Sequence, residues 1–146
     1  MVIILAAALF YFGIFNREQP QPSNQQTEQP ISTASGNWGT KIDNQPPVTI
    51  KITPIEFGKY AQTWKFRVVF DTHSGNLDDD LLTAASLVDD NANVYRPVSW
   101  EGPGPGGHHR EGALIFNPVQ PLPKYIELKI KNVGGVSERS FKWVLE

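Results

Sequence analysis

Cysteine is absent from this chain of 146 residues. Its absence excludes disulfide bonds, thiolate metal sites, cysteine nucleophiles and tethering through a lipid-modified cysteine. The one methionine is Met1, so the sulfur ligands that a blue-copper site requires are missing as well. Any metal site in this protein therefore has to use histidine nitrogens and oxygen ligands.

Two further absences argue against nucleic-acid binding and against catalysis. The chain has no excess of basic residues, with 13 Lys and Arg against 15 Asp and Glu and a net charge of −2 at pH 7. Electrostatic capture of nucleic acid requires such an excess, so no nucleic-acid partner is predicted. The chain also has no Gly-x-Ser-x-Gly elbow, phosphate-binding loop or zinc-protease helix motif. We therefore expect a protein that is not an enzyme.

The chain begins with an apolar segment. Residues 1–15 contain no charged side chain, and polar and charged residues follow at once. As a helix this segment would span ~22 Å, less than the ~30 Å hydrocarbon core of a bilayer. Positive residues before it and a small-residue cleavage site, the marks of a secretory signal, are not evident. We expect an uncleaved signal anchor, with a cleaved signal and a buried helix as alternatives. The domain that follows is then held at the membrane on its extracytoplasmic side.

Residues 16–46 are rich in Gln, Ser, Thr and Asn. Such a segment buries too little apolar surface to offset the entropy lost on ordering, and its prolines stiffen it. We predict a disordered Pro/Gln-rich linker that holds the domain away from the bilayer. Trp38 and Ile42 leave open an alternative in which the ordered region begins near residue 38.

Alternation of apolar and polar residues dominates residues 47–146 and predicts strands. The predicted strands cover residues 48–53, 64–71, 84–89, 94–100, 112–116, 126–131 and 140–145. One face of the alternating strands is apolar and the other is charged, which is typical of antiparallel sheets. We predict one all-β domain, an immunoglobulin-like antiparallel β-sandwich of about seven strands.

The same alternation predicts which aromatic side chains fill the core. The inward-facing aromatics are Trp64, Phe66, Phe70, Phe116, Phe141 and Trp143. Between the strands, Asp78–Asp80 precede Leu81 and can cap one short helical turn. The loop Asp90–Asn93 carries Asn and Asp, which tolerate left-handed turn geometry.

Four segments resemble sequences of known bacterial families. The stretch Ser86–Tyr95, together with the Gly-x-Leu-x-Phe strand Gly112–Phe116, is similar to telokin-like, immunoglobulin-like domains of bacterial envelope proteins. The Asp-Thr-His-Ser segment at 71–74 and the Gly-Gly-His-His-Arg segment at 106–110 resemble uncharacterised membrane-anchored bacterial proteins. This resemblance implies an extracytoplasmic binding or assembly module, although a shared fold by itself does not define a function.

The most unusual local sequence is a Gly/Pro loop followed by histidines. Residues 102–107 contain four glycines and two prolines, so they belong to neither a helix nor a strand interior. His108 and His109 follow directly, and His73 lies at the end of another strand. We predict a candidate metal site formed by His73, His108, His109 and Asp71, with Zn²⁺ or Cu²⁺ as the suited ion.

Other interpretations of these residues stay open. The histidines can be surface groups or hydrogen-bonded to loop carbonyls, and the Gly-rich backbone with Arg110 can bind an anion. A contact loop for a partner would use Trp100, Glu101 and Arg110, and Trp100 can instead pack beneath the loop. A further set of acidic residues is expected to be solvated at turns, and the alternative is that they bind Ca²⁺. The set is Asp78, Asp79, Asp80, Asp89 and Asp90.

The sequence thus supports two functional hypotheses. The first is a membrane-tethered, non-enzymatic β-sandwich that contacts another protein of the cell envelope and needs no cofactor. The second is a module that binds copper or zinc through His73, His108 and His109.

Overall fold

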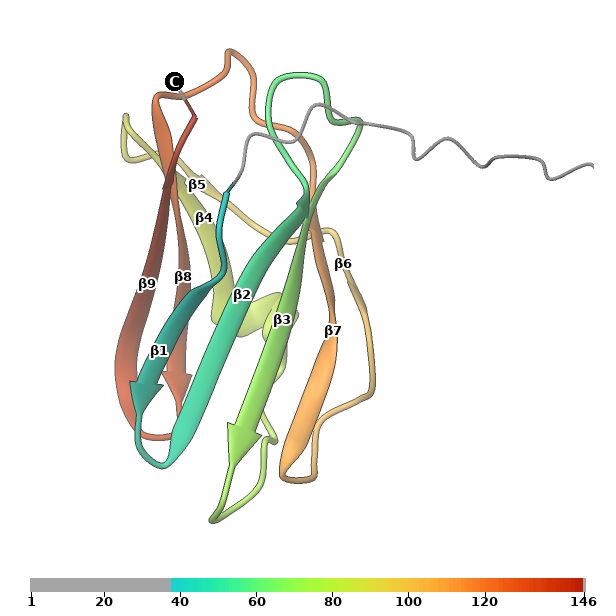
Figure 1. The fold of residues 1–146 in the computed structure, drawn as a ribbon, viewed down its shortest axis with the longest axis vertical. Helices are drawn as coiled ribbons and strands as arrows, with labels where there is room; N and C mark the ends of the chain where they lie inside the picture. The colour runs from blue at the N-terminus through green and yellow to red at the C-terminus, as the bar shows by residue number, and fades with distance from the viewer. Residues whose placement is uncertain (1–37, 146) are drawn as a thin grey trace, which may run out of the picture. The chain divides into compact units, whose positions relative to one another are not determined.

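The computed structural model describes residues 38–145, which form two antiparallel β-sheets packed face to face (Figure 1). The five-stranded sheet contains, in spatial order, β1 (Lys41–Gln45), β2 (Val48–Glu56), β3 (Trp64–Thr72), β7 (His109–Phe116) and β6 (Ser99–Glu101). The four-stranded sheet contains β5 (Val94–Tyr95), β4 (Ala85–Asp89), β8 (Tyr125–Val133) and β9 (Val136–Val144). The predicted all-β sandwich is confirmed at this level. The predicted anchor, residues 1–15, lies outside the described residues.

Two strands are additional to those predicted from the sequence. Residues 41–45, which the sequence assigned to the linker 16–46, form β1 and pair with β2. Residues 41–45 therefore belong to the folded domain rather than to the linker. The predicted strand 94–100 is divided, because Pro97 cannot donate a ladder hydrogen bond and the chain crosses from one sheet to the other there.

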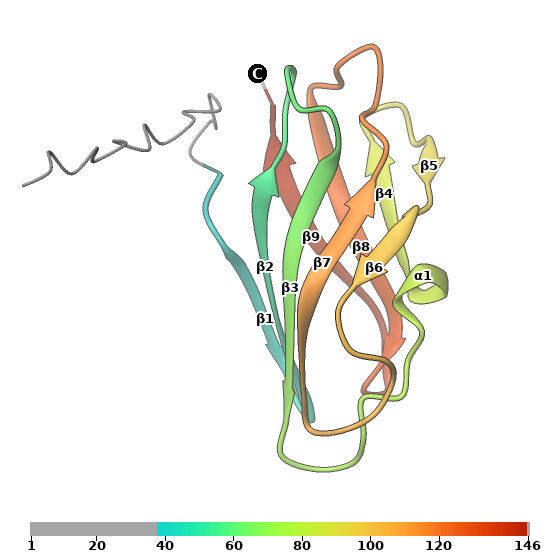
Figure 2. The same ribbon diagram turned by 90° about the vertical axis from the view of Figure 1, so that its right-hand side faces the viewer.

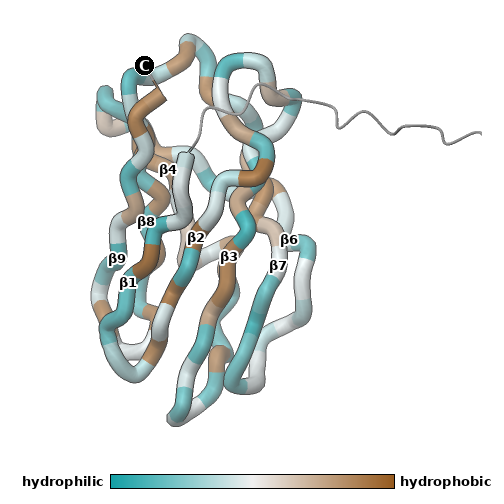
Figure 3. The backbone as a smooth tube through the Cα atoms, viewed as in Figure 1, coloured by the Kyte–Doolittle hydropathy of each residue, from teal (hydrophilic) through white to brown (hydrophobic). Residues whose placement is uncertain are grey.

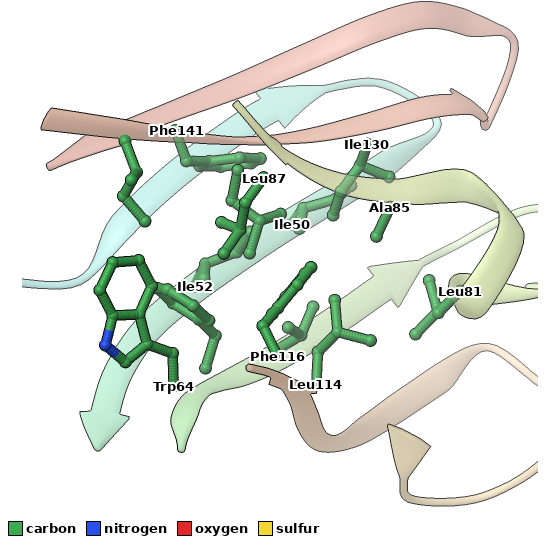
Figure 4. Close-up of a cluster of buried hydrophobic side chains, with 14 of the residues drawn as sticks. Ile50, Ile52, Trp64, Leu81, Ala85, Leu87, Leu114, Phe116, Ile130 and Phe141 are labelled. Carbon is green, nitrogen blue, oxygen red and sulfur yellow. The ribbon is translucent and has the colours of Figure 1, made fainter. Parts of the chain in front are cut away.

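The core forms where the inner faces of the two sheets meet. All six aromatics predicted to face inward are at most 3% exposed, which confirms the predicted strand phases. Phe66 in β3 packs against Phe116 in β7 and against Trp143 in β9, at ring-centroid distances of 5.9 and 5.5 Å. Figure 4 shows side chains of both sheets pointing toward one another, and Figure 3 shows the alternation along the strands. Burial of this apolar surface is the main stabilising term of the fold.

The predicted helical turn and the predicted left-handed loop are both present. Asp80 caps α1 (Leu81–Ala84), since its carboxylate accepts from the Leu82 backbone N–H at 3.1 Å and from the Thr83 hydroxyl at 2.8 Å. In the β4–β5 loop Ala92 has φ of 63°, a conformation that favours glycine or asparagine.

A buried ion pair joins β1 to the opposite sheet. The Arg139 side chain on β9 is fully buried and pairs with the Asp43 carboxylate on β1, whose side chain is 17% exposed. The same guanidinium donates to the backbone oxygens of Val48 at 3.0 Å and Gln45 at 2.9 Å. Arg139 therefore fastens the β1–β2 hairpin to β9.

Two tryptophans make a similar connection at the other end of β1. The Trp38 indole donates to the Val144 carbonyl at 2.9 Å, and the Trp143 indole donates to the Gly39 carbonyl at 3.1 Å. Trp38 also packs edge-on against Phe57, with ring centroids 4.8 Å apart. The chain that leads into β1 is thus part of the folded domain.

Removing Asp43 alone should leave the Arg139 charge buried without its ion-pair partner. We expect Asp43→Ala to lower the free energy of unfolding by about 3 kcal/mol, because an unpaired buried charge is strongly destabilising. The double replacement Asp43→Leu/Arg139→Met removes both charges and should lose much less. Urea unfolding of residues 16–146, followed by tryptophan fluorescence, measures both effects. Equal losses in the single and the double variant would contradict this assignment.

Candidate functional site

Two loops lie side by side at one end of the sandwich, visible at the lower end of Figure 2. One connects β3 to α1 and the other connects β6 to β7. Backbone hydrogen bonds join them from Thr72 N to His108 O at 2.9 Å, from Leu77 N to Gly107 O at 3.0 Å, and from Gly106 N to Leu77 O at 2.8 Å. The two loops therefore behave as one paired unit rather than as separate flexible segments.

Arg110 fixes this loop pair from the inside. The residue is 3% exposed, and its guanidinium donates to the backbone oxygens of Leu77 at 3.1 Å, Asp79 at 2.7 Å and Pro103 at 3.3 Å. Burial lowers the pKa of Arg110, and the nearby Asp79 carboxylate opposes that shift. The guanidinium is thus engaged within the protein, and it does not face an external anion or partner as the sequence-based alternatives assumed.

Trp100 lies beneath the Gly/Pro loop. Its indole N–H donates to the Pro103 carbonyl at 2.9 Å, and the Arg110 guanidinium lies 5.7 Å from the ring centroid. A Cβ built at Gly102 or at Gly112 would lie 2.5 or 2.7 Å from a ring carbon of Trp100. Both glycines are needed for this close approach. Of the two sequence-based interpretations of Trp100, the structure has the one in which it holds the loop.

All four predicted metal ligands line one open hollow of about 580 Å³ beside this loop pair. His109 is the first residue of β7, whereas His108 belongs to the β6–β7 loop and His73 to the β3–α1 loop. Asp71 lies opposite His109, because β3 pairs with β7 in that register. Thr49, Lys51 and Thr72 also line the hollow and were not among the predicted residues.

A chain of polar side-chain contacts runs from the hollow across the outer face of the sheet. His109 Nδ1 lies 2.6 Å from Asp71 Oδ1, and Lys51 Nζ lies 3.7 Å from Asp71 Oδ2. On the other side His109 Nε2 lies 3.8 Å from Glu111 Oε2, and Glu111 pairs with Arg67 at 2.5 Å. The hydrogen bond with His109 lowers the pKa of Asp71; partial burial opposes that shift and Lys51 adds to it.

This arrangement bears on the metal hypothesis in two ways. The predicted residues share one hollow, as the hypothesis requires. Within residues 38–145, however, no three His, Asp or Glu side chains are arranged to hold a metal ion. Asp71 already contacts His109 and Lys51, so its role beside an ion would be to orient the His109 ring, as carboxylates do behind metal-bound imidazoles.

Two of the five acidic residues considered as a Ca²⁺ site, Asp80 and Asp89, stabilise their own loops. Asp80 caps α1, as described above. Asp89 accepts hydrogen bonds from the backbone N–H groups of Asn91 and Asn93, both at 2.9 Å, and from the Tyr95 hydroxyl at 2.8 Å. Burial raises the pKa of Asp89, but the bonds from Asn93 and Tyr95 outweigh this and lower it overall. Asp89 therefore stabilises the β4–β5 loop.

Comparison with known proteins adds no identity. The chain matches no family model, no curated protein and no solved structure. Among the described residues no helix is long and apolar enough to cross a membrane. What the protein does has to be inferred from its own residues.

The loop end offers a direct stability test. Gly112→Ala would put a Cβ 2.5 Å from the Glu101 backbone oxygen, so we expect a loss of about 1–3 kcal/mol through overpacking. Gly104→Ala is the matched control, because nothing lies within 4 Å of its Cβ position, and its effect should stay within about 0.5 kcal/mol. Thermal unfolding followed by circular dichroism measures both variants. Similar losses at the two positions would contradict the packing of Trp100 and β6 against Gly112.

Proposed function

We propose that this protein is a non-enzymatic binding module of the cell envelope, tethered to the membrane through residues 1–15. Its domain is immunoglobulin-like and extracytoplasmic, and its partner is another envelope protein. The observation that carries the proposal is the paired loop end, where backbone bonds and Arg110 hold two separate segments around one hollow.

The paired loops are suited to binding because they are already ordered. Association is weakened when loops or side chains have to be immobilised, and a preorganised surface avoids most of that loss. The guanidinium of Arg110 and the indole of Trp100 hold the loop backbone from beneath. The groups left at the surface include the exposed histidines His73 and His108.

The position of the loop end also supports the proposal. The described chain begins at Trp38, which packs against Phe57 just after β2. The hollow is lined by Thr49 and Asp71. These residues lie near the start of β2 and the end of β3, which is the opposite end of the two strands (Figure 1). Within the domain, the hollow therefore lies at the end away from Trp38.

Site-specific photocross-linking in the cells that make the protein tests this proposal. A benzophenone amino acid replaces Ser74, which is exposed next to the hollow, in the full-length chain. We expect one adduct of defined mass from this position, because a bound partner covers the loop end.

The control position is Tyr60, which is 77% exposed in the loop at the other end of the domain. It should give no adduct of that mass. Equal labelling from Tyr60 and Ser74, or no adduct from Ser74, would contradict binding at the loop end.

Metal binding is the second candidate function, and one observation favours it. The three histidines of the chain come from two segments distant in sequence, with His73 in one and His108 and His109 in the other, and all of them line the same hollow. Imidazole nitrogens suit Zn²⁺ and Cu²⁺, and His73 and His108 are exposed.

Calorimetric titration with Zn²⁺ and Cu²⁺ tests this candidate on an untagged chain of residues 16–146. We expect His108→Ala/His109→Ala to weaken binding by about tenfold or more, because two of three imidazole ligands are lost. Glu127→Gln, on the outer face of the other sheet, is the control and should bind like the wild type. Equal affinity in all three proteins would eliminate the proposed ligands.

A further inference from the structure

The Gly/Pro loop lies beside the β3–α1 loop at the paired loop end (Figure 2). Pro103, Gly104 and Pro105 are exposed, and nothing lies within 4 Å of a Cβ position on Gly104. We call these three residues the loop tip. None of the three contributes to the hydrophobic core.

Residues outside the loop tip form hydrogen bonds that fix its position. Pro103 O accepts from the Trp100 indole at 2.9 Å and from Arg110 at 3.3 Å, while Gly106 N donates to Leu77 O at 2.8 Å. The loop is thus hydrogen-bonded to the rest of the domain at both ends of the tip. Prolines restrict the backbone between these two attachments. The result is a stiff, exposed loop tip at the end of the domain.

We propose that the loop tip inserts into an aromatic-lined groove on the protein partner. This inference rests on the proposed function and specifies the chemistry of its contact. Proline rings are apolar and rigid, and Pro-rich segments dock on grooves lined by aromatic side chains because little conformational freedom remains to be lost. Gly104 between the two prolines has no side chain to shield its carbonyl oxygen, which can accept a hydrogen bond from Trp or Tyr of the groove.

The contact residues assigned in this way differ from those that the sequence suggested. Trp100 and Arg110 are turned inward and support the loop, whereas the tip carries the exposed apolar surface. His108 follows the tip directly and lines the hollow. Tip and hollow therefore form one continuous surface that a single partner can cover.

The test places the benzophenone amino acid at Gly104 and, as a matched control, at Gly39. Both glycines have open space around their Cβ positions and neither has a left-handed φ, so both accept a side chain without strain. In the full-length chain in its own cells, we expect the Gly104 probe to give the same partner adduct as the Ser74 probe. The modified partner peptide should contain Trp, Tyr or Phe. Gly39 should give no such adduct.

A second measurement uses Pro103→Ala/Pro105→Ala with the probe at Ser74. Loss of the tip anchors should reduce the adduct by about tenfold, as expected for a central interface contact. Thermal unfolding should stay unchanged, since neither proline contributes to the core.

The outcomes separate this inference from the proposed function. An adduct from Ser74 with none from Gly104 would overturn the insertion of the tip and leave the binding module standing. An adduct from Gly104 to a peptide without aromatic residues, equal labelling from Gly39, or an undiminished adduct in the proline variant would also overturn it. No adduct from either loop position would remove both.

Discussion

Two buried guanidinium groups hold the loop end of this sandwich together. Arg139 on β9 and Arg110 on β7 both occupy the inward phase of their strands, where the apolar filling between the sheets ends. Each binds backbone carbonyls of segments distant in sequence, Arg139 those of the β1–β2 hairpin and Arg110 those of the paired loops. Without either arginine side chain, several backbone carbonyls would lose their hydrogen-bond donor. The β1–β2 hairpin or the paired loops would then lose their side-chain link to the domain, and hydrophobic contacts could not replace those hydrogen bonds.

The sequence predicts much of this fold because most strands have one apolar face and one polar face. The six inward aromatics follow from alternation alone. Arg110 is in phase with Leu114 and Arg139 with Phe141, but both lie just before the predicted strands 112–116 and 140–145. Arg110 was therefore expected at a partner contact or an anion site, and Arg139 was not singled out. An arginine at an inward position indicates that backbone carbonyls or a carboxylate are present nearby to accept its hydrogen bonds. The strand β1 gives no such signal, since its side chains are polar or exposed and only Asp43 faces the domain. It is held by partners around a hundred residues away, which no local pattern contains.

The candidate site was predictable in its residue types and unpredictable in its geometry. Asp, His and a Gly/Pro loop stand out in the sequence, and they do meet. Their meeting depends on the register in which Asp71 lies opposite His109, set by the core contacts of β3 and β7. The participation of Thr49 and Lys51 depends on the next register, between β2 and β3, and carries no sequence mark of its own. A shift of one residue would turn Asp71 and His109 into the core, so packing of the interior fixes the site.

The outer faces of the sheets support our placing of the proposed binding surface at the end of the domain. On these faces opposite charges meet across neighbouring strands, with Arg67 and Glu111 in one sheet and Lys129 and Glu138 in the other, at 2.5 and 2.8 Å. Such exposed pairs add little stability, but they leave each face solvated and locally neutral. The loop end is different, because its arginine anchor is buried and its exposed groups include imidazoles, prolines and glycine peptides. A partner that covers this end displaces water from groups that remain available, whereas a partner on the sheet faces would have to break ion pairs that already satisfy one another.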